Sequence, residues 1–166
     1  MRRSDDGLPV TCLLAGTARG VVLKLTEPLN AWGGLDADSG VIVHHSHPQR
    51  GQCVAGRVLV MPQTRGSGTN AQVFAQSWAN GRGPLAVVLG APDYVLCAGA
   101  VVGRELYDVT CPVVIADPAA YDALSDGDEV TVAATDDHAT VRIDAPASGK
   151  PRQLGPDQFG HQRIRS

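Results

Sequence analysis

Three short apolar runs, each followed by a segment with helical features, constrain the fold of this chain more than any other feature. The runs are VAGRVLVMP (54–62), PLAVVLG (84–90) and CPVVIA (111–116). Continuous runs rich in β-branched residues are typical of strands that are buried on both faces, as in parallel sheets with helical crossovers. Their alternation with helical segments predicts a parallel β/α core, and we expect a mixed, β-rich α/β domain.

The segments between these runs carry helix signals. Side chains of one apolar face recur three and four residues apart at Val73, Phe74, Ser77 and Trp78. With the stop signal Asn80-Gly81, this spacing predicts a helix at 70–80. A second helix is expected to begin near Asp93. A short third helix should follow Asp117, with that residue as N-cap and a proline at the first helical position.

Further strands are expected on both sides of this core. VTCLLAG (10–16) and RGVVLKL (19–25) are predicted to be adjacent strands, and VIV (41–43) a short one. Residues 128–134 and 139–143 should form an antiparallel hairpin. We divide the chain into a flexible N-terminus (1–9), one domain (10–144) and a flexible C-terminal tail (145–166) that is rich in Pro, Gly and Gln.

Composition excludes several classes of function. The 166 residues carry a net charge of −3, which argues against a nucleic-acid partner or a membrane-surface role based on overall basicity. No apolar run approaches the roughly 20 residues of a membrane span, and no secretory signal is apparent. The cysteines are Cys12, Cys53, Cys97 and Cys111. None forms a CxxC pair, so we expect buried free thiols, no metal or iron–sulfur site on this chain alone, and a cytoplasmic location.

The stretch RGSGTNA (65–71) places a serine between two glycines at the expected start of the first helix. A helix N-terminus offers unpaired N–H groups and a positive dipole end, and glycines let a ligand approach the backbone. The same surroundings would stabilise an alkoxide on Ser67. The lysine of a P-loop is missing, which excludes nucleotide binding through that motif. The alternative is that Ser67 or Thr69 only caps the helix.

Three other features are weaker candidates. His44, His45 and His47 lie in one loop, and the first two would point to opposite faces of an extended chain. With Asp36 or Asp38 they could contribute to a metal site, although a polar loop is the default interpretation.

Trp32 either anchors an interface or covers an edge of the core. The acidic segment SDGDE (125–129) is expected to be a solvated turn.

Several stretches together resemble one family. They are EPLNAWGGLDADSG, HPQRGQCVAGRVLVMPQTRGSGTNA and GPLAVVLGAPDYVLCAGAVVGRELYDVTCPVV. Their residues, order and spacing resemble the small subunit, or swivel domain, of aconitase X. The resemblance covers roughly residues 12–143.

The resemblance implies a swivelling β/β/α domain that closes over a larger subunit, which carries iron or an iron–sulfur cluster. Such enzymes are hydro-lyases that dehydrate cis-3-hydroxy-L-proline, mainly in bacteria, or mevalonate 5-phosphate, mainly in archaea. Ser67 falls on the general-base position of the wider superfamily. By the same resemblance, a small carboxylate substrate would contact the neighbouring residues Arg65, Gly66, Gly68, Thr69 and Asn70.

The sequence departs from the family pattern in two places. The resemblance implies a serine-rich run after Gly66, where this chain has Ser67-Gly68-Thr69-Asn70. It also implies Ser-Phe before the tryptophan, where this chain has Asn30-Ala31. Two other hypotheses therefore stay open: a stand-alone domain that binds a small anion or works without iron, and a structural subunit in which Ser67 is only a cap.

Overall fold

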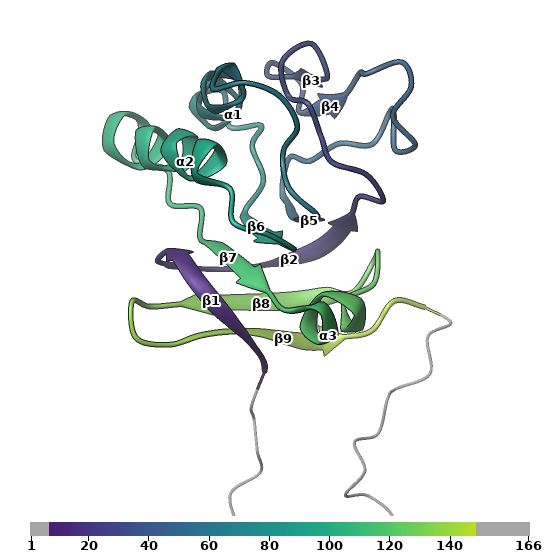
Figure 1. Cartoon of the computed structure of the whole chain (residues 1–166), viewed down its shortest axis with the longest axis vertical. Coiled ribbons are helices and arrows are strands. Elements are labelled where there is room, and N and C mark those ends of the chain that lie inside the picture. The colour runs from purple at the N-terminus through teal and green to yellow at the C-terminus, as the bar shows by residue number, and fades with distance from the viewer. Residues whose placement is uncertain (1–6, 149–166) are drawn as a thin grey trace, which may run out of the picture.

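A computed structural model describes residues 7–148, which form a closed β-barrel with two long helices packed against its outside (Figure 1). The barrel strands are β1 (Leu8–Leu14), β2 (Gly16–Lys24), β5 (Arg57–Met61), β6 (Ala86–Leu89), β7 (Val113–Ala116), β8 (Glu129–Ala134) and β9 (Ala139–Ala145). A separate two-stranded sheet contains β3 (Leu35–Asp36) and β4 (Val41–Ile42). The helices are α1 (Thr69–Ala79), α2 (Tyr94–Tyr107) and α3 (Pro118–Ala123).

The predicted parallel β/α core is confirmed. β5, β6 and β7 are neighbours and parallel, and β2 extends this parallel set beyond β5. Side chains alternate across the sheet: Val58 and Val60 belong to the core inside the barrel, whereas Leu59 and Met61 belong to the core under the helices. Since both faces are buried, these strands read as continuous apolar runs.

The two helices pack closely along their length. α1 buries Phe74 and Trp78, as its spacing predicts, and the two rings are 5.8 Å apart. A Cβ atom at Gly99 of α2 would lie 2.7 Å from the Ala71 carbonyl oxygen of α1, so only glycine permits this approach. The helix starts at Asp93 and Asp117 are also confirmed, since each carboxylate accepts a bond from a backbone N–H group of the first turn.

The expected pairing of the first two strands is wrong. β1 and β2 are separated by one residue, which is too short for a hairpin turn. The chain bends there instead: β1 pairs with β7 and β9, and β2 pairs with β5 and β8. The predicted β8–β9 hairpin is present, and the β9–β1 ladder at Leu8 and Pro9 closes the barrel.

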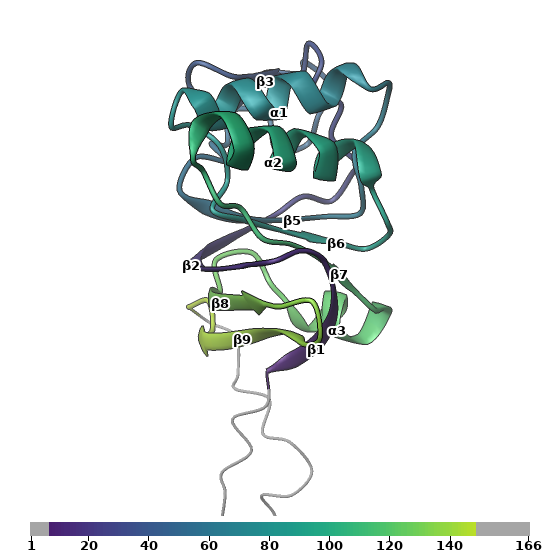
Figure 2. The same ribbon diagram turned by 90° about the vertical axis from the view of Figure 1, so that its left-hand side faces the viewer.

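The chain enters and leaves the barrel at the end remote from α1 and α2 (Figure 2). Leu8 and Pro9 lie in β1 and Ala145 in β9, whereas the sequence places them in flexible termini. Most of the predicted C-terminal tail, from residue 149 onward, lies outside the described residues. In the described part, no helix has the length and apolar character required to cross a membrane.

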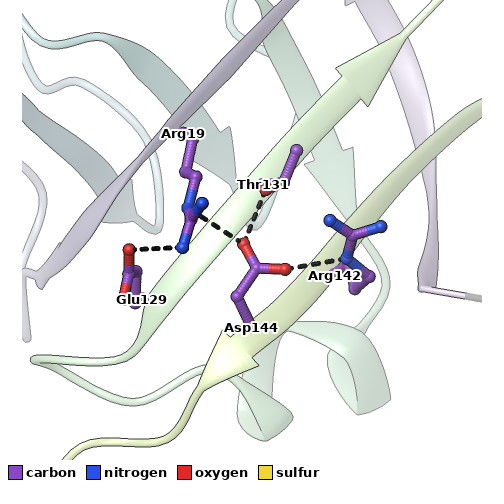
Figure 3. Close-up of polar contacts among 5 residues, drawn as sticks. All are labelled: Arg19, Glu129, Thr131, Arg142 and Asp144. Carbon is purple, nitrogen blue, oxygen red and sulfur yellow. Dashed lines mark hydrogen bonds and ion pairs between the residues drawn. The ribbon is translucent and has the colours of Figure 1, made fainter.

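Polar side chains of β2, β8 and β9 form a cluster on the outer surface of the barrel (Figure 3). Arg19 pairs with Glu129 at 2.8 Å, and Asp144 accepts bonds from Thr131 at 2.6 Å and from Arg142 at 2.7 Å.

The acidic turn at 125–129 is less solvated than its composition predicts. Asp128 is buried and accepts bonds from the Ser125 and Ala147 N–H groups at 2.8 and 2.7 Å, so it organises the turn.

Candidate active site

Ser67 lies in the loop that leads from the carboxyl end of β5 to the first residue of α1, and it is exposed. The N-cap of α1 is Gly68, which has no side chain to cap the helix. The Ser67 hydroxyl donates to Thr69 Oγ1 at 3.1 Å and accepts a long bond of 3.4 Å from the Thr69 N–H group. These local contacts leave the serine oxygen accessible at the positive end of the helix.

Backbone donors surround this serine. Within residues 7–148, the N–H groups of Gly66, Ser67 and Gly68 have no hydrogen-bond partner. Unpaired donors at a helix N-terminus favour negative charge, on a substrate oxygen or on a serine alkoxide.

The two glycines beside Ser67 differ in conformation. Gly66 has a φ of +108°, and a Cβ atom there would lie 3.0 Å from Asn30 Oδ1. Gly68 is helical with a φ of −54°, and a Cβ atom there would meet nothing within 4 Å. Gly66 is therefore required by the backbone, whereas Gly68 only keeps the approach to Ser67 open.

Asp93 fixes the beginning of the loop. Its carboxylate accepts from the Thr64 N–H group at 2.7 Å and from the Thr64 hydroxyl, and it caps α2 by accepting from the Leu96 N–H group at 3.0 Å. One buried carboxylate thus joins the start of α2 to the residue that precedes Arg65.

Asn70 fixes the other end. Its side chain is buried, donates to the Arg65 carbonyl at 2.7 Å and accepts from the Trp32 N–H group at 3.0 Å. The side chain that the sequence assigns to substrate contact therefore faces the protein interior. Asn70 positions the loop and the Trp32 segment, and both the oxygen and the nitrogen of its amide are hydrogen-bonded within the protein.

A small pocket of about 100 Å³ lies beside the loop. It is lined by Arg65, Asn30, His44 and Ser46, among others. The Arg65 guanidinium makes no ion pair within the described residues, and Asn30 Oδ1 is buried without a hydrogen-bond partner there. The pocket thus offers a cation and an amide beside the loop that carries Ser67, and sequence reasoning identified only Arg65 of these two groups.

The histidine loop does not match its predicted geometry. The His44 and His45 rings stack with centroids 5.1 Å apart, so the loop is not extended and the rings do not face opposite sides. His47 is buried and accepts from the Gln49 N–H group at 3.1 Å. Asp36 binds Ser39, and Asp38 binds Asn80. Across residues 7–148, no group of three His, Cys, Asp or Glu side chains could hold a metal ion.

The cysteines are free thiols, as expected, but within the described part only Cys111 is fully buried. Burial, assisted by the charge of Asp93, raises the pKa of Cys97 to about 11. Burial also raises the pKa of Cys12 and of Cys111. These three thiols are therefore protonated at neutral pH in the structure as described.

Two exposed aromatic residues lie beside the ends of the loop. Trp32, whose N–H group binds Asn70, is 63% exposed, and it therefore does not cover the core. Tyr94 follows Asp93 and is 75% exposed. Tyr94 has no distinguishing signal in the sequence.

Comparison with known proteins identifies the family. A family model of the aconitase X swivel domain matches residues 8–143. Cis-3-hydroxy-L-proline dehydratase of Pseudomonas aeruginosa is 38% identical over 101 residues, which are 61% of this chain and 17% of that protein. The phosphomevalonate dehydratase small subunit of Methanosarcina acetivorans is 30% identical over 118 residues, which are 70% of this chain and 78% of that protein.

Solved structures agree. The crystal structure of Thermococcus kodakaraensis aconitase X in its holo form superposes with a TM-score of 0.70 at 27% identity, covering 81% of this chain and 96% of that chain. The chain spans less than a fifth of the length of the hydroxyproline dehydratases that it matches, at 17% and 18%. The match over nearly all of the barrel and both helices shows that this chain belongs to the aconitase X swivel domain family.

Proposed function

We propose that this chain is the small subunit of an aconitase X-type hydro-lyase, in which Ser67 is the general base. The observation that carries the proposal is an exposed serine between two glycines at the start of α1, next to three unpaired backbone N–H groups. Both relatives named above are dehydratases, and the one from Methanosarcina acetivorans is named a small subunit.

In the proposed reaction, the Ser67 alkoxide takes the proton from the carbon next to the substrate carboxylate. The electron pair of that C–H bond forms the double bond as the hydroxyl group leaves from the neighbouring carbon. The backbone donors stabilise the alkoxide and the developing negative charge. Arg65, which is exposed beside Ser67, would bind the carboxylate with two parallel hydrogen bonds.

We place the iron or iron–sulfur cluster implied by the family on the large subunit, because residues 7–148 contain no suitable group of ligands. Bound there, the metal would act as a Lewis acid on the leaving hydroxyl. The exposure of Ser67 supports a partner that closes over the loop. A serine hydroxyl in water remains protonated at neutral pH, whereas a partner that excludes water would strengthen the stabilisation of the alkoxide by the backbone N–H groups.

A compound like cis-3-hydroxy-L-proline is the substrate that we favour. Arg65 is the one Arg or Lys side chain among the residues that line the small pocket, which also include Glu27, His44 and His47, and a single guanidinium suits one carboxylate better than a carboxylate and a phosphate. Mevalonate 5-phosphate is the second candidate, favoured by the similarity to phosphomevalonate dehydratase small subunits. A stand-alone anion-binding domain is the third, favoured by the loop sequence Ser67-Gly68-Thr69-Asn70.

The test is to co-express this chain with the aconitase X large subunit of the same organism and to assay the iron-loaded complex with both substrates. We expect turnover of cis-3-hydroxy-L-proline by the complex and none by the isolated chain. Turnover of mevalonate 5-phosphate alone would transfer the assignment to that substrate. A chain that forms no complex and binds small carboxylates by itself would support the stand-alone domain.

A further inference from the structure

Helix α2 exposes apolar side chains along its whole length. Tyr94, Ala98, Val102 and Leu106 follow one another at intervals of four residues, with Val101 beside them. Leu106 is 69% exposed and Val102 is 38% exposed. A stripe of this kind usually faces a protein core, but here the buried face of α2 is a different one, made by Leu96, Gly99, Ala100 and Gly103.

A groove of about 280 Å³ continues this stripe toward α1. Its walls include Ala71, Gln72 and Gln76 of α1 and Ala98, Val102 and Tyr107 of α2.

This surface carries little charge. α1 has no charged side chain, and α2 has two, Arg104 and Glu105, which bind each other at 3.0 Å. Depletion of charge and exposure of tyrosine are typical of the central part of a protein interface.

The surface adjoins the Ser67 loop. The groove begins at Ala71 and Gln72, within the first turn of α1, and α1 and α2 run parallel, since Gly99 contacts Ala71 and Gly103 contacts Trp78. Tyr94 follows Asp93, whose carboxylate holds Thr64. A molecule that covers Ser67 would therefore also contact Tyr94 and the end of the groove at Ala71 and Gln72.

We infer that the groove and the exposed face of α2 form the docking surface for the large subunit, an inference that rests on the proposed function. A stable interface needs about 800 Å² from each partner, and the few exposed residues of the loop supply only a small part of that area. The remaining area would come from the groove and the exposed face of α2, which lie next to the loop, are apolar and carry little charge.

The described residues include no segment that covers this surface. β1 begins and β9 ends at the far end of the barrel from α1 and α2 (Figures 1 and 2). A second copy of the chain is the other possible occupant, and the experiment below distinguishes the two.

The test is the double variant Val102→Glu/Leu106→Glu, titrated against the co-expressed and separated large subunit by calorimetry. Leu85→Glu is the matched control: Leu85 is 39% exposed and precedes β6, at the opposite end of the parallel strands from Ser67. We expect affinity to fall at least about 100-fold for the double variant and less than about threefold for the control, because the interface would have to bury two charges. Thermal unfolding and circular dichroism verify folding, and Tyr94→Ser gives a milder second variant.

Binding of the double variant within about threefold of wild type would overturn the docking surface and leave the proposed function intact. A different result would assign the surface to a second copy and overturn the inference. In that case the wild-type chain forms a dimer and does not bind the large subunit, and the double variant abolishes the dimer. A wild-type complex that assembles through this surface but dehydrates neither substrate would refute the proposed function alone.

Discussion

At the scale of single residues, the glycines on either side of Ser67 have different roles. Ala at position 66 would have to adopt a φ of +108° with its Cβ atom 3.0 Å from Asn30 Oδ1, whereas Ala at position 68 meets nothing within 4 Å and suits the helical φ. We expect Gly66→Ala to lower the free energy of unfolding by about 1–3 kcal/mol and Gly68→Ala to change it by less than about 0.5 kcal/mol. Urea titrations of the two variants check this, and equal losses would contradict the described loop conformation.

Asn70 gives a second prediction at this scale. Asn70→Ala leaves the Trp32 N–H group and the Arg65 carbonyl without their partner, so we expect a loss of about 2–4 kcal/mol in stability. In the complex, kcat should fall about tenfold or more with a smaller change in KM, because the loop that carries Ser67 is displaced.

Asn70→Asp separates positioning from general destabilisation. It keeps the acceptor for Trp32 but loses the donor to Arg65, and its kcat should lie between those of wild type and Asn70→Ala. The exposed Gln72→Ala serves as a stability control on the same helix. If Asn70→Ala raised KM alone, the side chain would bind substrate as the sequence predicts.

The candidate site is only partly predictable from sequence, for a physical reason. Ser67, its glycines and Arg65 are contiguous, so a local pattern reveals them. Asp93 binds Thr64 from 29 positions away along the chain, and Asn30 approaches Gly66 from 36 positions away. No local spacing in the sequence encodes such contacts.

At the scale of elements, two helix caps provide a matched comparison. Asp117 caps α3 through the Ala120 N–H group, whereas Asp93 caps α2 and also holds Thr64. We expect Asp117→Ala to cost about 1 kcal/mol and Asp93→Ala about 2–4 kcal/mol in unfolding free energy. Chemical denaturation measures both, and equal costs would show that the bonds to Thr64 contribute nothing.

The elements themselves differ in how well sequence predicts them. β5, β6 and β7 are buried on both faces, so their apolar runs identify them and their helical crossovers make them parallel. The closure of the barrel is not predictable in this way, because the β1–β9 pairing joins Leu8 and Pro9 to residues more than 130 positions away along the chain. The predicted strands 10–16 and 19–25 are separated by two residues, a length that a hairpin allows, whereas the structure leaves only Ala15 between β1 and β2.

At the scale of the whole molecule, the polar cluster of Figure 3 links stability to pH. Burial alone would raise the pKa of Asp144, but the bonds from Thr131 and Arg142 and the charges of Arg142 and Arg19 outweigh it and lower the pKa. A lowered pKa in the folded state stabilises the protein above the unfolded-state value of about 4 and loses that effect as the pH falls through the folded-state value.

We therefore expect Asp144→Asn to reduce the unfolding free energy by about 1–2 kcal/mol at pH 7, and by progressively less below about pH 4. Asp137→Asn, at an exposed site in the β8–β9 turn, is the control and should change little at either pH. Urea unfolding at both pH values measures the difference. If Asp144→Asn lowered the unfolding free energy by the same amount at pH 7 and at pH 3, the charge of Asp144 would not be the source of the lost stability.

The central claim is that Ser67 removes the proton from a substrate bound between this chain and its partner. The most direct measurement is the exchange of the proton next to the carboxylate of cis-3-hydroxy-L-proline in D₂O, followed by NMR in the assembled, iron-loaded complex. For Ser67→Ala we predict exchange at least about 100-fold slower with unchanged assembly, and for Ser125→Ala, in the turn after α3, the wild-type rate. An exchange rate for Ser67→Ala within about threefold of wild type would contradict the account. Ser67 would then have only a structural role at the start of α1.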